Sequence, residues 1–473
     1  MSEQITLLDN YEVIVVGAGV GGVGTAALLA KQGRKVLLLE KNPKVGGKCV
    51  SHKKEGYHFP VFVHAFGRGR KGSNSRIAKE LGEEIAWTTI NNLPVCINGE
   101  WMGFTASGRP IGVKVPLKDI IPLVKLVLVD TLPKLFTKAG QDELDRTDIK
   151  SWLSKRTDNP KLHAIVGYLA SALYCIPYWE ASVGEIVGTF RGLMKGKIAY
   201  PVNECESIPE THFKGFKKYG GGFKQDNVKR VVVSEGKVKG VELSDGKVLE
   251  APLVISNAGI RTTVLDLVGE EYFDKSYVNY VKGLKPSWSA LVLHIALSKK
   301  ITDKPVVLYA HTLDVEGYTK QLERGEIPDK PYIWCMVTTN WTSSFAPPGN
   351  QIICIGCPMP YRKEADWKKW ADNIIESGEE LFPGLKENII YKELITPDYL
   401  QNWGDNEGVL LQAAQTNWQV GANRPSMISP INGLFYVGVD VANSRKTRCV
   451  GVDAAGEVAL ECAEIVTNRL GPA

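Results

Sequence analysis

The hydrophobic pattern of the N-terminal region predicts the start of a parallel sheet. Residues 13–16 are four consecutive β-branched residues, which is typical of a buried strand. A glycine-rich turn follows, then a helical run over residues 23–32, and then a second apolar run over residues 35–39 that ends at Glu40. This order of strand, turn, helix and strand predicts the first half of a dinucleotide-binding unit.

The turn between the first strand and the helix has the spacing of a phosphate-binding loop. Gly17, Gly19 and Gly22 fit G-x-G-x-x-G, and the helix N-terminus behind them favours an anionic group. Glu40 follows Gly22 by 18 residues, where a carboxylate can accept both hydroxyls of an adenosine ribose and repels a 2′-phosphate. The sequence therefore predicts a ligand that contains ADP, and it disfavours both NADP, because of its 2′-phosphate, and a turn without a ligand. NAD and FAD both stay open. The residues predicted to contact this ligand are Gly17, Gly19, Val20, Gly21, Gly22, Glu40 and Lys41.

Later in the chain the pattern changes to alternating strands and an amphipathic helix. Residues 93–104 predict a hairpin with Asn98-Gly99 as its turn, and residues 285–301 and 349–360 predict further strands. Residues 363–384 have helical spacing and end at a Pro-Gly pair. A sheet with helices of this kind predicts a second domain, which would bind the substrate.

A second glycine pair, Gly46-Gly47, precedes Lys48 in the stretch KNPKVGGKCV. With this segment the sequence resembles the large FAD family that includes phytoene desaturases, carotenoid isomerases, retinol saturases and amine oxidases. In that family a Gly-Gly-Arg segment runs along the pyrophosphate of the flavin, so the resemblance implies FAD as the cofactor and Gly46, Gly47 and Lys48 as part of its site. Lysine keeps the charge of the usual arginine but lacks its bidentate fork.

The resemblance extends over most of the chain. Residues 147–173 look like helices of the family's substrate domain, and residues 227–259 look like its returning hairpin and strand. Residues 408–440 and 451–466 look like its C-terminal flavin segment.

Further cofactor contacts are implied by the same resemblance. Val228 would meet the adenine through its backbone, and Gly438 with Asp440 would contact the ribityl or pyrophosphate part of FAD. The family usually has Gly-Asp here, whereas this chain has Val439 between the two residues. The last helix would open with its N-terminus towards the pyrimidine end of the flavin ring. Its first residues are Gly451, Val452 and Asp453.

His64 is the one candidate for a catalytic residue. It follows the glycine pair at the distance where the family's chain passes the flavin ring, and a histidine satisfied within the core is the alternative. The seven histidines show no H-x-x-x-H or H-E-x-x-H spacing. Cys354 and Cys357 lie in a strand pattern that points them to opposite faces. No metal site is therefore predicted.

The implied fold is α/β, with a Rossmann-like FAD-binding domain of the glutathione-reductase type and an inserted, discontinuous α+β substrate domain. The FAD-binding domain is expected in three parts, which are residues 1–85, 219–265 and 395–473. The substrate domain is expected in two parts, residues 86–218 and 266–394.

The implied activity is that of an FAD-dependent oxidoreductase acting on C–C single or double bonds of a long apolar lipid, polyisoprenoid or carotenoid-like substrate, as a desaturase, saturase or isomerase. One alternative is an amine oxidase-like flavoenzyme, although residues 445–456 lack the Trp-bearing stretch of that group. The other is a non-enzymatic prenyl- or lipid-binding escort protein, against which the intact glycine motifs argue. No second G-x-G-x-x-G follows a strand, so no nicotinamide domain is expected and the electron acceptor is unknown.

Residues 113–136 predict a contact with a membrane surface. The segment is dense in Ile, Leu and Val, and prolines at 122 and 133 are expected to break it into pieces too short to span a bilayer. Lysines spaced through an apolar segment can reach lipid headgroups. A helical pair that packs on the protein's own core is the alternative. The lysines are Lys114, Lys118, Lys125 and Lys134.

The bulk composition is that of a globular protein, with 44% hydrophobic and 23% charged residues among 473. The net charge of +5 is small and no basic block is interleaved with aromatic residues, which argues against nucleic-acid binding. Nine scattered cysteines make no disulfide framework, and the first ten residues carry no secretory signal. These features predict a cytoplasmic protein associated with membranes.

Overall fold

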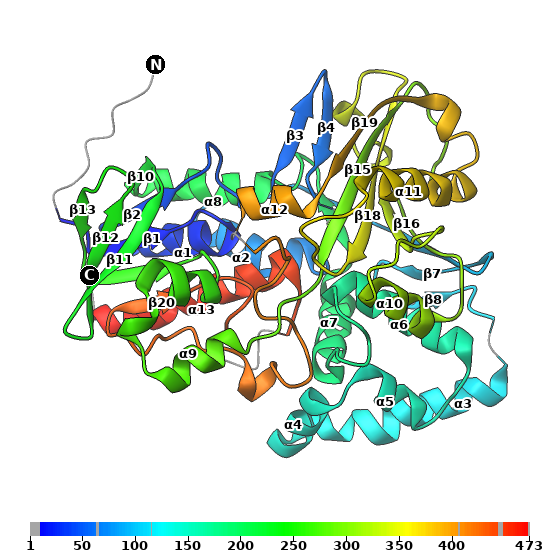
Figure 1. Ribbon diagram of the computed structural model, residues 1–473, viewed down its shortest axis with the longest axis horizontal. Helices are drawn as coiled ribbons and strands as arrows, with labels where there is room; N and C mark the ends of the chain where they lie inside the picture. The colour runs from blue at the N-terminus through cyan, green and yellow to red at the C-terminus, as the bar shows by residue number, and fades with distance from the viewer. Residues whose placement is uncertain (1–9, 63–65, 115, 405–406, 443–447, 472–473) are drawn as a thin grey trace.

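The structure, a computed structural model, describes residues 10–62, 66–114, 116–404, 407–442 and 448–471. Two main sheets, of five and eight strands, form the left and right halves of the molecule in Figure 1, and helices pack around both. Each half has its own cluster of buried apolar side chains. The predicted α/β fold class is confirmed.

The smaller sheet is parallel throughout. β1 at its centre pairs with β2 on one side and β14 on the other, so that Val13 lies opposite both Val36 and Leu253. All four residues of β1 are apolar and buried, as expected for a strand covered on both faces. In order across the sheet, the strands are β10 (Gly222–Gln225), β2 (Val36–Glu40), β1 (Val13–Val16), β14 (Leu253–Ser256) and β20 (Leu434–Tyr436).

Helices and a small sheet cover the five-stranded sheet. α1 (Val20–Lys31) packs against α8 (Ser207–Lys218) and α13 (Gly451–Leu470), and α13 also contacts α2 (Ser73–Glu80). An antiparallel sheet contacts β14 through β12. Its strands are β11 (Val228–Ser234), β12 (Lys237–Leu243) and β13 (Val248–Glu250). The sheet draws its strands from all three segments expected to form the FAD-binding domain, but α8, expected in the substrate domain, packs on α1.

The larger sheet is mixed. Only the β16–β6 pair is parallel among its described strand pairs, and the edge strand β19 pairs with β15. In order across the sheet, the strands are β19 (Ile389–Ile395), β15 (Ser289–Leu297), β18 (Gln351–Met359), β17 (Ile333–Met336), β16 (Val306–Ala310), β6 (Asn92–Ile97), β7 (Glu100–Thr105) and β8 (Pro110–Ile111).

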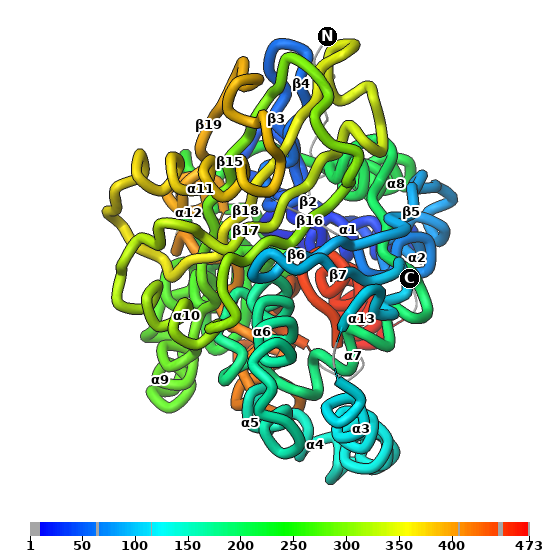
Figure 2. The backbone as a smooth tube through the Cα atoms, turned by 90° about the vertical axis from the view of Figure 1, so that its right-hand side faces the viewer, coloured from blue at the N-terminus to red at the C-terminus, as the bar shows by residue number. Residues whose placement is uncertain are grey.

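The remaining elements are helices around the larger sheet and two short antiparallel strand pairs. Helices α3, α4 and α5 lie at the end of the molecule that is lowest in Figures 1 and 2, and α6 and α7 lie above them. The strand pairs are β3 (Ser51–Lys54) with β4 (Tyr57–Pro60), and β5 (Trp87–Thr89) with β9 (Ala199–Pro201). The helices are α3 (Leu117–Lys125), α4 (Lys138–Arg146), α5 (Ile149–Ser154), α6 (Pro160–Tyr174), α7 (Val183–Gly196), α9 (Lys275–Lys282), α10 (Val315–Glu323), α11 (Trp367–Leu381) and α12 (Pro397–Trp403). Short 3₁₀ and π segments are η1 (Gly69–Lys71), η2 (Leu126–Thr131), η3 (Pro133–Phe136), η4 (Thr262–Val268), η5 (Glu270–Tyr272), η6 (Thr338–Asn340), η7 (Ser343–Phe345), η8 (Lys386–Asn388) and η9 (Gly421–Asn423).

Most elements predicted from the hydrophobic pattern are present. The hairpin of β6 and β7 turns at Asn98 and Gly99, whose φ angles of +51° and +76° suit the predicted turn. The predicted start of the first helix at residue 23 is wrong, because α1 already begins at Val20. Glycines disfavour helices in isolation, but here close packing against the sheet stabilises two of them within the first turn.

Residues 117–136 form a nearly continuous helical segment, which we call the apolar arm. The expectation that Pro122 breaks this segment is wrong, since α3 runs through it and passes into the π turns of η2 and then into η3. No residue of α3 or η3 is buried, whereas η2 buries Leu126 and Thr131. In the described part of the chain, no helix is both long and apolar enough to cross a membrane.

Ile255 provides a test of how much the parallel sheet contributes to stability. It is fully buried in β14 between β1 and β20. Ile255→Ala leaves a cavity there and is expected to lower the free energy of unfolding by about 2–5 kcal/mol in urea titrations followed by circular dichroism. The matched control is Ile390→Ala in β19, where the side chain is exposed, and its effect should stay below about 0.5 kcal/mol. Equal effects of the two substitutions would contradict this assignment of the core.

Candidate cofactor and substrate site

The glycine loop after β1 lets α1 begin close to the sheet. Gly17 has φ +92°, a left-handed backbone that glycine adopts without a steric penalty. A Cβ atom at Gly22 would lie 2.1 Å from the carbonyl oxygen of Gly17, so a larger residue does not fit. A cavity is lined by Gly17, Gly19, Val20 and Gly21. Gly22 does not line it, and instead allows α1 to pack closely against β1.

Asn257 connects this loop to the chain after β20 through two hydrogen bonds. The sequence analysis did not predict this residue as part of the site. Its Oδ1 accepts a hydrogen bond of 3.0 Å from the N–H of Gly22, and its Nδ2 donates one of 2.9 Å to the carbonyl of Val437. A Cβ atom at Gly19 would lie only 2.6 Å from Asn257 Oδ1. An amide directly after the buried run of β14 was the available signal, because the carboxyl ends of parallel strands meet at one edge.

Glu40 lines the same cavity at the end of β2. Its Oε2 accepts a hydrogen bond of 2.7 Å from the N–H of Ala18, and its Oε1 accepts one of 2.8 Å from that of Asn42. Burial raises the pKa of this carboxyl, and the two backbone donors oppose the rise. Each oxygen has a second lone pair, so Glu40 can hold the loop and still accept ribose hydroxyls. Lys41 also lines the cavity, and its Nζ lies 3.4 Å from the carbonyl of Asn402.

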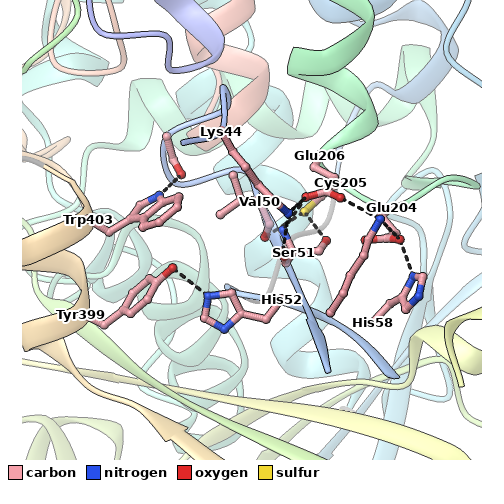
Figure 3. A network of polar contacts seen from close by, with 12 residues as sticks. Lys44, Val50, Ser51, His52, His58, Glu204, Cys205, Glu206, Tyr399 and Trp403 are labelled. Carbon is pink, nitrogen blue, oxygen red and sulfur yellow. Dashed lines mark hydrogen bonds and ion pairs between the residues drawn. The ribbon is translucent and has the colours of Figure 1, made fainter. Parts of the chain in front are cut away.

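The second glycine pair runs directly beside the first loop. The N–H of Gly46 donates a hydrogen bond of 2.7 Å to the carbonyl of Ala18, and a Cβ atom at Gly47 would lie 3.2 Å from the Cα of Gly19. Lys48 lines the cavity, but its Nζ donates to the carbonyls of residues 409 and 410 at 2.9 and 3.0 Å. Trp403, another residue that the sequence analysis missed, donates its indole N–H to the carbonyl of Gly47 at 2.8 Å (Figure 3).

The implied contacts from the middle and end of the chain reach this cavity too. Val228, Gly438 and Asp440 line it. Asp440 Oδ1 accepts hydrogen bonds from the N–H groups of Gln412 and Ala413 at 2.8 and 3.2 Å, so this carboxylate also orders the irregular stretch beside it.

The first residues of α13 lie in two different surroundings. Gly451 and Val452 line the cavity. Asp453 is buried, and its Oδ2 accepts a hydrogen bond of 3.0 Å from the N–H of Gly67. Burial raises the pKa of Asp453 to about 6, although the nearby Arg68 guanidinium opposes this. The structure therefore places Asp453 in contact with the chain that follows β4 and not at the cavity wall.

His64 lies outside the described residues, so the structure does not place this candidate. Cys354 and Cys357 are both buried in β18, and burial raises the pKa of both thiols. Cys357 lines the cavity and Cys354 is not among its lining residues. The structure also brings together His52 and His294, which their spacing along the sequence did not predict.

One cavity of about 410 Å³ joins the cofactor residues to the larger sheet. Away from the glycine loops its walls come from α6 and from β15, β17 and β18, and they are mainly apolar. The side chains there include Phe62, Leu173, Ala290, Val292, Trp334 and Cys357. The nucleotide-binding loops and an apolar wall therefore border one continuous space.

Glu185 in α7 is connected through Gln415 to the segment before α13. This residue of α7 is buried, and its Oε2 accepts a hydrogen bond of 2.7 Å from Nε2 of Gln415, which also donates to the carbonyl of Cys449 at 3.1 Å. Burial raises the pKa of Glu185 to about 7, and the charges of Arg424 and Arg448 oppose this rise.

This shift predicts a pH-dependent stability. Because the pKa of Glu185 is higher in the folded state than its ordinary value, its contribution is fully present below about pH 4.5 and is lost as the pH rises through about 7. Relative to Glu185→Gln, which cannot ionise, the wild type should lose melting temperature between about pH 5 and about pH 8. Differential scanning calorimetry measures this, with Glu235→Gln at an exposed turn as the control. If the difference in melting temperature between the wild type and Glu185→Gln does not change with pH, this prediction is wrong.

Comparisons with known proteins agree with this geometry. The family model of the NAD(P)-binding Rossmann-like domain matches residues 15–81. The chain is 27% identical over 440 residues to the chloroplastic prolycopene isomerase of Arabidopsis thaliana, covering 82% of this chain and 71% of that protein. It is 23% identical to the 4,4′-diaponeurosporene oxygenase of Staphylococcus aureus strain Mu50, covering 91% and 93% of the two chains.

Solved structures share the fold over nearly the whole chain. An oxidoreductase from Methanosarcina mazei superposes with a TM-score of 0.69 at 18% identity, covering 96% of this chain and 99% of that chain. Wild-type putrescine oxidase bound to putrescine superposes with a TM-score of 0.71 at 12% identity, covering 97% and 99%. The resemblance predicted from the sequence is thus confirmed, since the chain is similar to a prolycopene isomerase and to a diaponeurosporene oxygenase and has the fold of putrescine oxidase.

Proposed function

We propose that this protein is an FAD-dependent oxidoreductase that desaturates, saturates or isomerises C–C bonds of a long, apolar, carotenoid-like isoprenoid. The observation that carries the proposal is the single cavity that runs from the glycine loops and Glu40 to the apolar face of the larger sheet. When bound, FAD can accept a hydride from carbon or return one.

The residues at the nucleotide end fit FAD. Glu40 would accept the ribose hydroxyls, and the N-terminus of α1 behind Gly17 and Gly19 would hold the pyrophosphate. Val228 would meet the adenine, and Gly451 with Val452 at the N-terminus of α13 would face the flavin ring. Gly46 and Gly47, packed beside Gly19, would complete the groove along the pyrophosphate.

The residues at the other end suit a hydrocarbon. Among the described lining residues there, none is a carboxylate, lysine, arginine or histidine. A charged amine would lose its hydration there without gaining a partner, whereas a polyene would bury apolar surface. The role of the protein is then to orient the substrate and to exclude water, and a carotenoid-like substrate agrees with the names of the relatives in Arabidopsis and Staphylococcus.

A membrane surface is the proposed source of such a substrate. The apolar arm exposes large side chains on the outside of the molecule, which soluble monomers rarely gather in one place. The exposed fractions are 69% for Leu117, 55% for Leu128, 62% for Val129 and 85% for Phe136. Lysines at 118, 125 and 134 lie among them, so the arm combines apolar area with positive charge in the way that favours anionic lipid.

The first test concerns the cofactor. Purified protein should be yellow from bound FAD, and Glu40→Arg should weaken FAD binding by about tenfold to a hundredfold, because it removes charge-assisted hydrogen bonds and adds a bulky cation. Flavin absorbance relative to protein absorbance after gel filtration gives the occupancy, and circular dichroism reports the fold. The exposed Glu250→Arg is the matched control and should keep its flavin. A colourless wild type that does not take up added FAD would favour the escort alternative.

The second test concerns the membrane. Replacing Leu117, Leu128 and Val129 together with Ser should weaken binding to vesicles containing phosphatidylserine by more than about tenfold, since each large aliphatic side chain contributes about 1.5–3 kcal/mol when buried. Vesicle binding by the wild type should also fall as salt rises, because each lysine near an anionic surface adds about 1 kcal/mol that salt screens.

Two exposed aliphatic residues elsewhere serve as the control. Val248→Ser with Ile390→Ser removes apolar surface outside the apolar arm and should leave vesicle sedimentation unchanged. If the wild type does not sediment with vesicles, or if the control variant loses binding as strongly as the arm variant, the proposed membrane contact is wrong.

A further inference from the structure

We propose that His52, His294 and Glu393 form a binding site for one divalent transition-metal cation of the Zn²⁺ class. One possible ligand atom from each side chain lies within 4.8 Å of the other two. The three residues are 242 and 99 positions apart along the chain, so no sequence motif joins them. They are absent from the walls of the cofactor cavity, and the site is therefore a separate one.

The fold brings these side chains together from three strands. His294 in β15 lies directly opposite Glu393 in the antiparallel strand β19, so both side chains leave the same face of the sheet. His52 belongs to β3, and its partner in the hairpin, Phe59, stacks on the ring of His294 with centroids 4.9 Å apart and planes 7° apart. The rings of His52 and His294 meet edge to face with centroids 6.1 Å apart.

His294 has the hydrogen-bond pattern of a metal-binding histidine. The side chain is fully buried, and its Nε2 lies 3.0 Å from the carbonyl of Pro60, so Nε2 carries the proton and donates. Nδ1 then has the free lone pair, and it is buried without a hydrogen-bond partner among the described residues. Metal ligands commonly donate their second ring N–H to a backbone carbonyl in this way, while an unsatisfied buried acceptor costs about 1–3 kcal/mol.

The other two side chains also have partners that would orient them. His52 Nε2 lies 2.9 Å from the hydroxyl of Tyr399 (Figure 3), and Tyr391 donates a hydrogen bond of 2.7 Å to Glu393 Oε2.

The chemistry of the donors selects the cation. Two imidazoles and one carboxylate suit Zn²⁺, Co²⁺ or Fe²⁺ and do not suit Ca²⁺ or Mg²⁺, which prefer oxygen alone. Ligand atoms around tetrahedral Zn²⁺ lie about 3.3 Å apart. His52 and Glu393 are only half-buried and can move towards the fixed His294, and water can take the fourth position.

Two lysines near the site are paired with carboxylates, which reduces their repulsion of a cation. Lys44, whose charge acts on His52, lies 3.3 Å from a carboxylate oxygen of Glu206 (Figure 3). Lys53 lies 3.4 Å from Glu204 and 3.2 Å from Glu206. A bound cation would join the hairpin of β3 and β4, which follows the second glycine pair, to the edge of the larger sheet. Its role is therefore structural.

The test uses the full-length protein, treated with a chelator, and Zn²⁺ or Co²⁺ as the probe. Isothermal titration calorimetry should give one Zn²⁺ per chain, and Co²⁺ should give visible ligand-field bands. His52→Gln and Glu393→Gln should each weaken Zn²⁺ binding by at least about tenfold. The matched control is His58→Gln in the same hairpin, because His58 is half-buried but bound to Glu204 outside the proposed site.

Several outcomes would overturn the proposal. These are no stoichiometric Zn²⁺ binding by the wild type, equal binding by the wild type and both ligand variants, or equal losses in His58→Gln. X-ray absorption at the zinc edge separates this site from binding to the cysteines, because sulfur neighbours would contradict it and nitrogen or oxygen neighbours support it. Circular dichroism of each variant identifies any that fails to fold, and the ligand assignment then rests on the other variant and on the absorption spectrum.

Discussion

The close approach of α1 to the edge of the parallel sheet is the constraint on which the site depends. Gly22 sits against the carbonyl of Gly17, and Asn257 fills the remaining space with one acceptor for the helix and one donor for the next strand. This contact lets the helix begin at the strand ends and places its N-terminus against the cavity. Side chains at these glycine positions would force the helix away from the sheet.

Around that contact, polar side chains mainly connect segments of backbone. Lys48 and Trp403 join the second glycine pair to the chain around residues 403–410, and Glu185 joins α7 to the chain before α13 through Gln415. Lys48 and Trp403 act at the wall of the cavity, whereas Glu185 and Gln415 join the two halves of the molecule outside its lining residues. A cofactor and a substrate held in the cavity would contact both halves at once.

The local parts of the fold were predictable from the sequence because they depend on short-range rules. The β-branched run before Gly17, the turn at Asn98-Gly99 and the helix that ends before Pro383 each have a signal within a few residues. The predicted start of α1 was wrong because packing against the sheet outweighed the local preference of glycine. The predicted break at Pro122 was wrong as well, and packing does not explain this, since α3 continues through the proline with none of its residues buried.

The site itself was predictable only where a motif or the family resemblance reached it. Asn257, Trp403 and Glu185 act through contacts with residues 235, 356 and 230 positions away, and no spacing along the sequence encodes such contacts. The pairing of His294 with Glu393 follows from strand register, which the alternating pattern of each strand does not determine on its own.

The order of strands in the parallel sheet has a consequence for how the chain folds. β1 needs β14, more than 200 residues later, and β14 in turn needs β20 near residue 434. During synthesis from the N-terminus, the edge of β14 therefore stays unpaired until almost the whole chain has been made, and long loops must close before the sheet is complete. A nascent or truncated chain that ends before residue 434 would expose an apolar strand edge, which is a template for aggregation. The late pairing of β14 therefore makes incomplete chains more prone to aggregation than the finished fold.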